Sequence, residues 1–73
     1  MNTIDIYLKD TMYQGDNIRF LVKEFHNPSY QEYLDFRKRV IIEGFEAIDK
    51  NITIYYAPTS IIKIIFSKNP WHL

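Results

Sequence analysis

The sequence predicts a single α+β domain in which the elements follow the order β-β-α-β-β. Four segments alternate apolar with polar residues or are rich in β-branched residues, as strands are: 4–9, 18–25, 52–56 and 61–67. One segment, 29–49, has the three-to-four-residue spacing of apolar residues that is typical of an amphipathic helix. With 73 residues, the chain has room for one domain spanning 1–73.

The composition excludes several classes of protein. Nine basic and nine acidic side chains give no net charge, and 47% of the residues are hydrophobic, too many for a disordered chain. The absence of cysteine excludes a disulfide framework, a thiolate zinc site and a thiol nucleophile. The first residues lack the pattern of a signal peptide, and the apolar runs are far shorter than the ~20 residues of a membrane span. We therefore expect a cytoplasmic protein that does not associate with a membrane.

The first hairpin is predicted over residues 3–25. In its first strand the even-numbered residues, including Leu8, are aliphatic and share one face. Residues 13–17 have turn-forming character and include Gly15. If Leu8 and Ile18 lie on the same face, the loop between them has an odd number of residues. We therefore expect a loop of about three or five residues with Gly15 at a bulge position.

The helix is predicted over residues 29–49. Ser29 is placed to cap its N-terminus, and Glu32, three residues later, completes a capping box. Asn51 tolerates a left-handed backbone conformation and is expected to end the helix.

The apolar stripe of this helix covers about half of its circumference, wider than the ~100° of an ordinary surface helix. We expect four apolar residues to face the sheet and three to flank it: Leu34, Ile41, Phe45 and Ile48, and then Tyr33, Phe36 and Val40.

Arg37 falls near the middle of the apolar half of the helix. The favoured interpretation is that its methylene groups follow the edge of the core while its guanidinium reaches water. The alternative is that the guanidinium binds an anion or a carboxylate of a partner at an apolar site.

The second hairpin is predicted over residues 52–68, and Pro70 leaves 69–73 as a tail. A right-handed crossover through the helix brings both hairpins into one four-stranded mixed sheet with the helix on one face. The first and last strands are then parallel neighbours in the middle, which gives the strand order 2-1-4-3. This arrangement resembles the β-grasp architecture of ubiquitin and of immunoglobulin-binding bacterial domains. The resemblance is one of architecture and implies no particular function.

The face of the predicted sheet that points away from the helix is unusually apolar. A sheet face in contact with water is mostly polar, but alternation places here aromatic, aliphatic and cationic residues, with only Asp5 of opposite charge. Exposed apolar patches of this kind mark contact surfaces. In the alternative, the tail or the loop of the first hairpin folds back over part of the face. We predict that ten residues bind a partner: Tyr7, Lys9, Arg19, Leu21, Lys23, Phe25, Tyr55, Ile61, Lys63 and Ile65.

No set of residues in the sequence points to catalysis. His26 and His72 have no sequence neighbour that would orient them as a base or a metal ligand, and the two glycines do not form a phosphate-binding loop. We therefore expect a protein that is not an enzyme and that holds no metal and no cofactor. The one enzymatic alternative is a small ribonuclease-type toxin that uses Tyr, Arg and Lys side chains without a histidine base.

These observations favour a small protein–protein interaction module. We expect either an accessory inhibitor of a host or defence protein, of the type that phages and mobile elements encode, or a homodimer. The alternative is a nucleic-acid-binding protein that stacks unpaired bases on the aromatic residues of the same face and follows phosphates with its lysines. The neutral total charge and the isoelectric point near 6.7 argue against that alternative.

Overall fold

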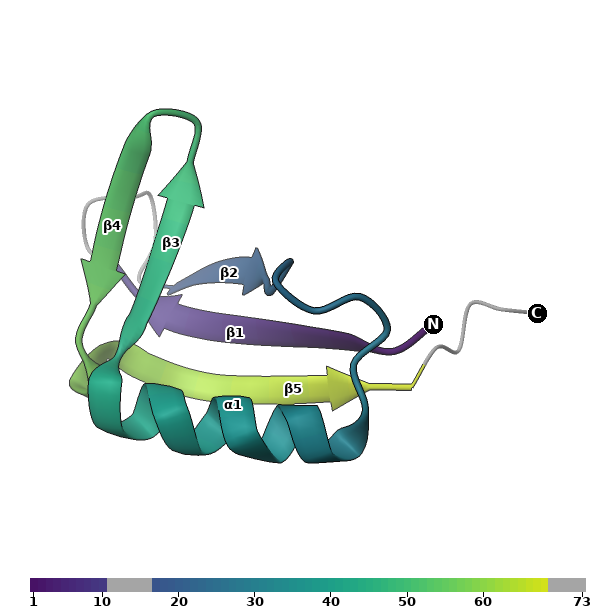
Figure 1. The fold of residues 1–73 in the computed structure, drawn as a ribbon. Helices are drawn as coiled ribbons and strands as arrows, with labels where there is room; N and C mark the ends of the chain where they lie inside the picture. The colour runs from purple at the N-terminus through teal and green to yellow at the C-terminus, as the bar shows by residue number, and fades with distance from the viewer. Residues whose placement is uncertain (11–16, 69–73) are drawn as a thin grey trace.

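The computed structural model describes residues 1–10 and 17–68, and this part of the chain contains one α-helix, one short 3-10 helix and five strands (Figure 1). The strands form two antiparallel sheets, so the predicted α+β class is confirmed. No helix in the described residues is long and apolar enough to cross a membrane. In chain order the elements are β1 (Thr3–Lys9), β2 (Asn17–Leu21), α1 (Tyr30–Glu43), β3 (Phe45–Asp49), β4 (Ile52–Tyr56), η1 (Pro58–Ser60) and β5 (Ile61–Ser67).

β1 is the central strand of the larger sheet, and β2 and β5 lie antiparallel on either side of it. Leu8 pairs with Ile18, which confirms that these two residues share a face. The predicted loop of three or five residues lies mostly outside the described residues. The predicted bulge at Gly15 lies outside the described residues.

The predicted start of the helix is correct. The hydroxyl oxygen of Ser29 accepts a hydrogen bond from the N–H of Glu32 at 3.1 Å. The carboxylate of Glu32 accepts in return from the N–H of Ser29 at 2.9 Å. This capping box satisfies two donors that the first turn of a helix leaves unpaired.

The predicted end of the helix is wrong. α1 stops at Glu43, and Gly44 has a φ of 85°, which residues with a side chain rarely adopt. A Cβ at this position would lie 2.5 Å from the backbone oxygen of Tyr56, so the close approach of β4 also requires glycine. Residues 45–49 form β3 instead of helix, and Asn51 lies in the turn between β3 and β4.

The additional strand changes the topology that follows it. β4 pairs with β3, so the predicted hairpin over 52–68 is wrong, and β5 joins β1. Because β3 adds one reversal of the chain after the helix, β5 runs antiparallel to β1 rather than parallel. The four-stranded mixed sheet of order 2-1-4-3, and the β-grasp likeness with it, is corrected to one sheet of order β2-β1-β5 and a separate pair β3-β4. The predicted tail, 69–73, lies outside the described residues.

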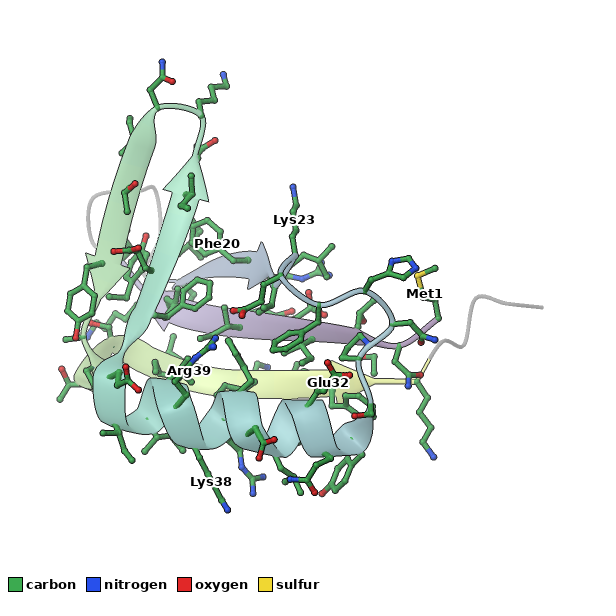
Figure 2. The ribbon with its side chains drawn as sticks, viewed as in Figure 1. Met1, Phe20, Lys23, Glu32, Lys38 and Arg39 are labelled. Atoms are coloured by element: carbon green, nitrogen blue, oxygen red, sulfur yellow. The ribbon has the colours of Figure 1, made fainter. Side chains whose placement is uncertain are left out.

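α1 and the β3–β4 hairpin pack against the same face of the larger sheet (Figure 1). Phe20 of β2 lies between the sheet and the hairpin (Figure 2), with its ring centroid 6.1 Å from that of Phe45 and 6.0 Å from that of Tyr56. Phe36 of α1 completes the cluster, 6.1 Å from Phe45. The larger sheet contributes to this core three side chains of β1 that have no exposed surface: Ile4, Ile6 and Leu8.

α1 turns a different side to the core than predicted. Phe36 and Val40 are buried, whereas Ile41 is 57% exposed. The prediction had placed Ile41 against the sheet and the other two at its flank. It failed because Phe45 and Ile48 are strand residues. Counted as helical, they shift the apparent centre of the apolar stripe toward Ile41.

Candidate functional site

The face of the larger sheet opposite the core carries six of the ten residues predicted to bind a partner. Side chains alternate along β1, so Tyr7 and Lys9 lie on the side away from the buried Leu8. Strand pairing places residues of β2 and β5 on that same side. We call this set the outer sheet face: Tyr7, Lys9, Arg19, Leu21, Lys63 and Ile65.

The outer sheet face is organised in two rows that cross the three strands. In one row two aliphatic side chains flank a carboxylate, and in the next two cations flank an aromatic ring: Leu21–Asp5–Ile65 and Arg19–Tyr7–Lys63. None of the described helices or strands packs on these rows. Apolar and cationic groups are therefore presented side by side on one surface.

Arg19 and Asp5 form an ion pair within this face. The carboxylate oxygen Oδ1 of Asp5 lies 2.8 Å from Nη2 and 2.9 Å from Nε of Arg19. The side chain of Asp5 is 9% exposed and that of Arg19 is 58% exposed. The hydrogen bond with Asp5, together with the attraction between the charges, raises the pKa of Arg19 above its ordinary value. Arg19 keeps further N–H donors that a partner can use, because a guanidinium has five.

Lys63 covers the ring of Tyr7. Its Nζ lies 4.7 Å from the ring centroid, within the range of a cation–π contact. Among the described residues, no carboxylate oxygen lies within 4.0 Å of this ammonium group. Lys63 therefore contacts an aromatic ring and still carries a charge that no carboxylate of the described residues pairs with.

Two predicted site residues belong to the core, so their assignment to this face is wrong. Phe25 follows the end of β2, where strand alternation no longer applies, and its ring meets Phe36 edge-on at 5.8 Å. Ile61 pairs with Leu8 because a bulge shifts the register of β5 there, and it packs against the core. Counting parity along a sequence cannot detect where a strand ends or where a bulge occurs.

Two more predicted site residues lie on other surfaces, so their assignment to this face is also wrong. Lys23 lies in the turn after β2, points away from β1 in Figure 2, and lines a cleft between β2 and β3 with Glu46 and Ile48. Tyr55 lies on β4, outside the larger sheet, and its hydroxyl donates to the backbone oxygen of Glu43 at 2.7 Å. Lys23 departs because β2 ends at Leu21, and Tyr55 departs because β4 pairs with β3 in a separate sheet.

Arg37 is exposed on α1, as its favoured interpretation expects for the guanidinium. Nη1 lies 3.4 Å from the hydroxyl of Tyr33, and Cζ lies 5.4 Å from the centroid of the same ring. Among the described residues it has no carboxylate within 4.0 Å. The guanidinium is therefore placed to meet a group from outside the described chain.

Sequence reasoning missed a second exposed apolar region, which lies at the end of α1 and on β5. Ile41, Ile42 and Ile62 expose 57%, 78% and 47% of their surface. The signal for it was the width of the helical apolar stripe, which exceeds what one packed face can bury. Part of this region forms a groove of about 300 Å³ that we call the α1–β5 groove, lined by Arg37, Ile41, Pro58, Ile61, Ile62, Lys63 and Ile64.

The chemistry available on these surfaces is that of contact and charge. Across residues 1–10 and 17–68, no group of three His, Cys, Asp or Glu side chains is arranged to hold a metal ion. His26 is exposed in the loop before α1, and His72 lies outside the described residues. The outer sheet face offers a phenol ring, aliphatic side chains and cations, which are suited to binding a surface.

Comparisons with models of protein families, with curated proteins and with solved structures gave no match to this chain.

Proposed function

We propose that this protein is a non-enzymatic protein–protein interaction module and that the outer sheet face is its binding surface. The observation that carries the proposal is the pair of rows on that face. Leu21, which is 45% exposed, stands there beside Arg19 and Tyr7 with no described element over them. Tyr and Arg are among the residues that contribute most to binding energy at interfaces. Interfaces also combine apolar side chains with polar and charged ones, as this face does.

The charges of the outer sheet face favour a partner with an acidic surface. Arg19 is partly neutralised by Asp5, but Lys9 and Lys63 have no carboxylate within 4.0 Å among the described residues. Complementary charge speeds association and excludes partners of the wrong sign. We therefore expect carboxylates of the partner to lie opposite these two lysines.

The role that we propose is an accessory inhibitor that occludes a host or defence protein in the cytoplasm, of the type that phages and mobile elements encode. The support for this role is the size and composition of the chain, 73 residues without cysteine. One face of so small a domain offers roughly half of a standard interface, enough to cover a site on a larger protein. A homodimer through the same face is the second use, and light scattering of the purified protein distinguishes it.

Nucleic-acid binding through this face has less support. The ring of Tyr7, which a base would stack on, is already covered by Lys63, and Arg19 is engaged by Asp5. The chain has no net charge, whereas a basic footprint is expected of such proteins. Binding to single-stranded oligonucleotides that weakens steeply and linearly in a log–log salt titration would favour this alternative over the proposal.

Capture of the partner from extracts of the native host tests the proposal. We expect Leu21→Gln and Lys9→Glu to reduce the amount of captured partner by about tenfold or more, because the first replaces an apolar contact with a polar group and the second reverses a charge. The matched controls are Ile52→Gln and Lys38→Glu, which make the same kinds of change at exposed positions away from this face. All four variants are expected to keep the melting temperature of the wild type. Full capture by both face variants would show that the outer sheet face is not the binding surface.

A further inference from the structure

β5 presents an unpaired edge. In an antiparallel ladder, the N–H and C=O of one residue point to the same neighbour, and those of the next residue point the opposite way. The N–H of Val22 in the β2 segment donates to the C=O of Ile4 at 2.9 Å, so the backbone groups of Ile4 point to β2. Those of Asp5 and Tyr7 consequently point to β5.

The same alternation fixes which groups of β5 are unpaired. Ile65 and Lys63 pair with Asp5 and Tyr7, so their backbone groups point back to β1. The N–H and C=O of Ile64 and of Phe66 therefore point away from the sheet. Among the described residues, neither has a hydrogen bond on that side.

This edge lacks most of the features that keep strand edges from pairing. Natural edge strands are protected by charged residues, prolines, bulges or short length. β5 is seven residues long. From Ile61 to Phe66 it has one charged residue, Lys63, and its bulge lies at one end, near Ile61. An apolar strand of this kind is expected to pair with another strand.

The α1–β5 groove runs beside this edge and is built to receive side chains. Ile41 of α1 forms one wall, Pro58 lies at the end, and Ile62 and Ile64 of β5 form the other wall. Ile41 and Ile62 remain 57% and 47% exposed. Ile41, which the core does not bury, therefore lines the groove beside the edge of β5.

The charges at the groove select the kind of strand. Arg37 lines it from the helix and Lys63 from the outer side of β5, and neither has a carboxylate within 4.0 Å among the described residues. A second copy of β5 would bring its own Lys63 and Arg37 to the same place, and like charges opposite each other destabilise a strand pair. A strand with Asp or Glu side chains would gain charge-assisted hydrogen bonds instead.

We propose that the β5 edge and the α1–β5 groove bind an extended segment of another protein, with aliphatic and acidic side chains, as a strand added next to β5. The N–H and C=O of Ile64 and Phe66 pair with the backbone of the segment. Its aliphatic side chains fill the groove against Ile41 and Ile62. This site is distinct from the contact assigned to the outer sheet face, and the two share only Lys63.

The experiment selects short random peptides displayed on phage against the full-length protein and then follows one selected peptide by NMR. The selected peptides are expected to contain both aliphatic residues and Asp or Glu. On binding, the amides of Ile64 and Phe66 should become protected from hydrogen exchange. The amides of Lys63 and Ile65 should be protected both with and without peptide, because they bond to β1. A peptide with Asn and Gln in place of its Asp and Glu should bind about tenfold more weakly or worse.

Variants separate this site from the others. Arg37→Glu is expected to lower the affinity for the selected peptide by about tenfold or more, because it removes a charge-assisted hydrogen bond and adds repulsion between like charges. Lys38→Glu is the matched control, because Lys38 points away from the sheet (Figure 2) and should leave the affinity unchanged. Leu21→Gln, which tests the outer sheet face, should also leave the affinity for the peptide unchanged.

Four results would overturn the inference. The first is a library that yields no binder, and the second is a set of selected peptides without acidic enrichment. The third is peptide binding that leaves the amides of Ile64 and Phe66 in fast exchange. The fourth is a stable dimer in which those two amides are already protected, since a second copy of β5 would then occupy the edge.

Discussion

The hydroxyl of Tyr56 donates a hydrogen bond to the carboxylate of Asp10, and the two residues are only 5% and 8% exposed. Tyr56 ends β4 and Asp10 follows β1, so this contact joins the smaller sheet to the larger one. A buried carboxylate is costly unless it is hydrogen-bonded. This hydrogen bond therefore holds the end of the β3–β4 hairpin in position against the larger sheet.

The first prediction concerns this hydrogen bond. Tyr56→Phe keeps the ring but removes the donor, so the free energy of unfolding should fall by about 1–3 kcal/mol, because a buried carboxylate loses a partner. The neighbouring Tyr55 is exposed and bonds to a backbone oxygen at the end of α1, and Tyr55→Phe is the matched control, expected to cost less than about 1 kcal/mol. Urea denaturation measures both. Equal losses would mean that the Tyr56 hydroxyl has no special role.

The second prediction concerns the residue that ends the helix. Gly44→Ala forces a side chain into a φ of 85° and places its Cβ 2.5 Å from the backbone oxygen of Tyr56. We expect a loss of more than about 2 kcal/mol, because strain and steric overlap add. Glu43→Ala, at an exposed helical position one residue earlier, should change stability by less than about 0.5 kcal/mol. Equal melting temperatures for the two variants would contradict the close contact between Gly44 and the backbone of Tyr56.

The third prediction compares the two ion pairs. Arg19→Gln leaves the carboxylate of Asp5, 9% exposed, without its partner, whereas Glu24→Gln breaks the pair with Arg39, whose members are 45% and 47% exposed. Glu24→Gln should cost less than about 1 kcal/mol, as exposed pairs do. Arg19→Gln should lower the free energy of unfolding clearly more, because the carboxylate that it leaves unpaired is buried. The midpoint of urea denaturation measures the difference between the two variants.

The dependence on pH follows from the raised pKa of Arg19. When folding raises the pKa of a group, the group stabilises the folded protein fully at any pH below its pKa in the unfolded chain. This stabilisation is lost only as the pH rises through the pKa of the group in the folded protein. Both values lie far above neutral. The difference between Arg19→Gln and wild type should therefore persist unchanged through neutral and mildly alkaline pH. A difference that vanished as the pH was raised over that range would contradict the assignment.

The fourth prediction tests the orientation of α1. Phe36 is buried in the core, whereas Ile42 is 78% exposed. Phe36→Ala should lower the free energy of unfolding by about 3–5 kcal/mol. Ile42→Ala should change it by less than about 0.5 kcal/mol, because little buried surface is lost. A large loss at Ile42 would show that the helix turns the other side to the sheet.

Local signals in the sequence determined much of the fold. The capping box of Ser29 and Glu32 is a contact between residues three apart, so it can be identified without knowledge of the rest of the chain. Alternation in β1 likewise identifies Leu8 as a buried residue and Tyr7 as a residue of the opposite face. The outer sheet face could be anticipated because strand alternation is also a local property.

What the sequence left undecided was which strand pairs with which, and that depends on contacts between distant residues. The segment from Phe45 to Asp49 continues the helical spacing of apolar residues, but its pairing with β4 and the close approach of Tyr56 to Gly44 make it a strand. That one choice reverses the direction of β5, removes Tyr55 from the larger sheet and leaves the edge of β5 unpaired. Burial and hydrogen bonding between distant residues decided it, because they outweigh the local helical spacing of a five-residue segment.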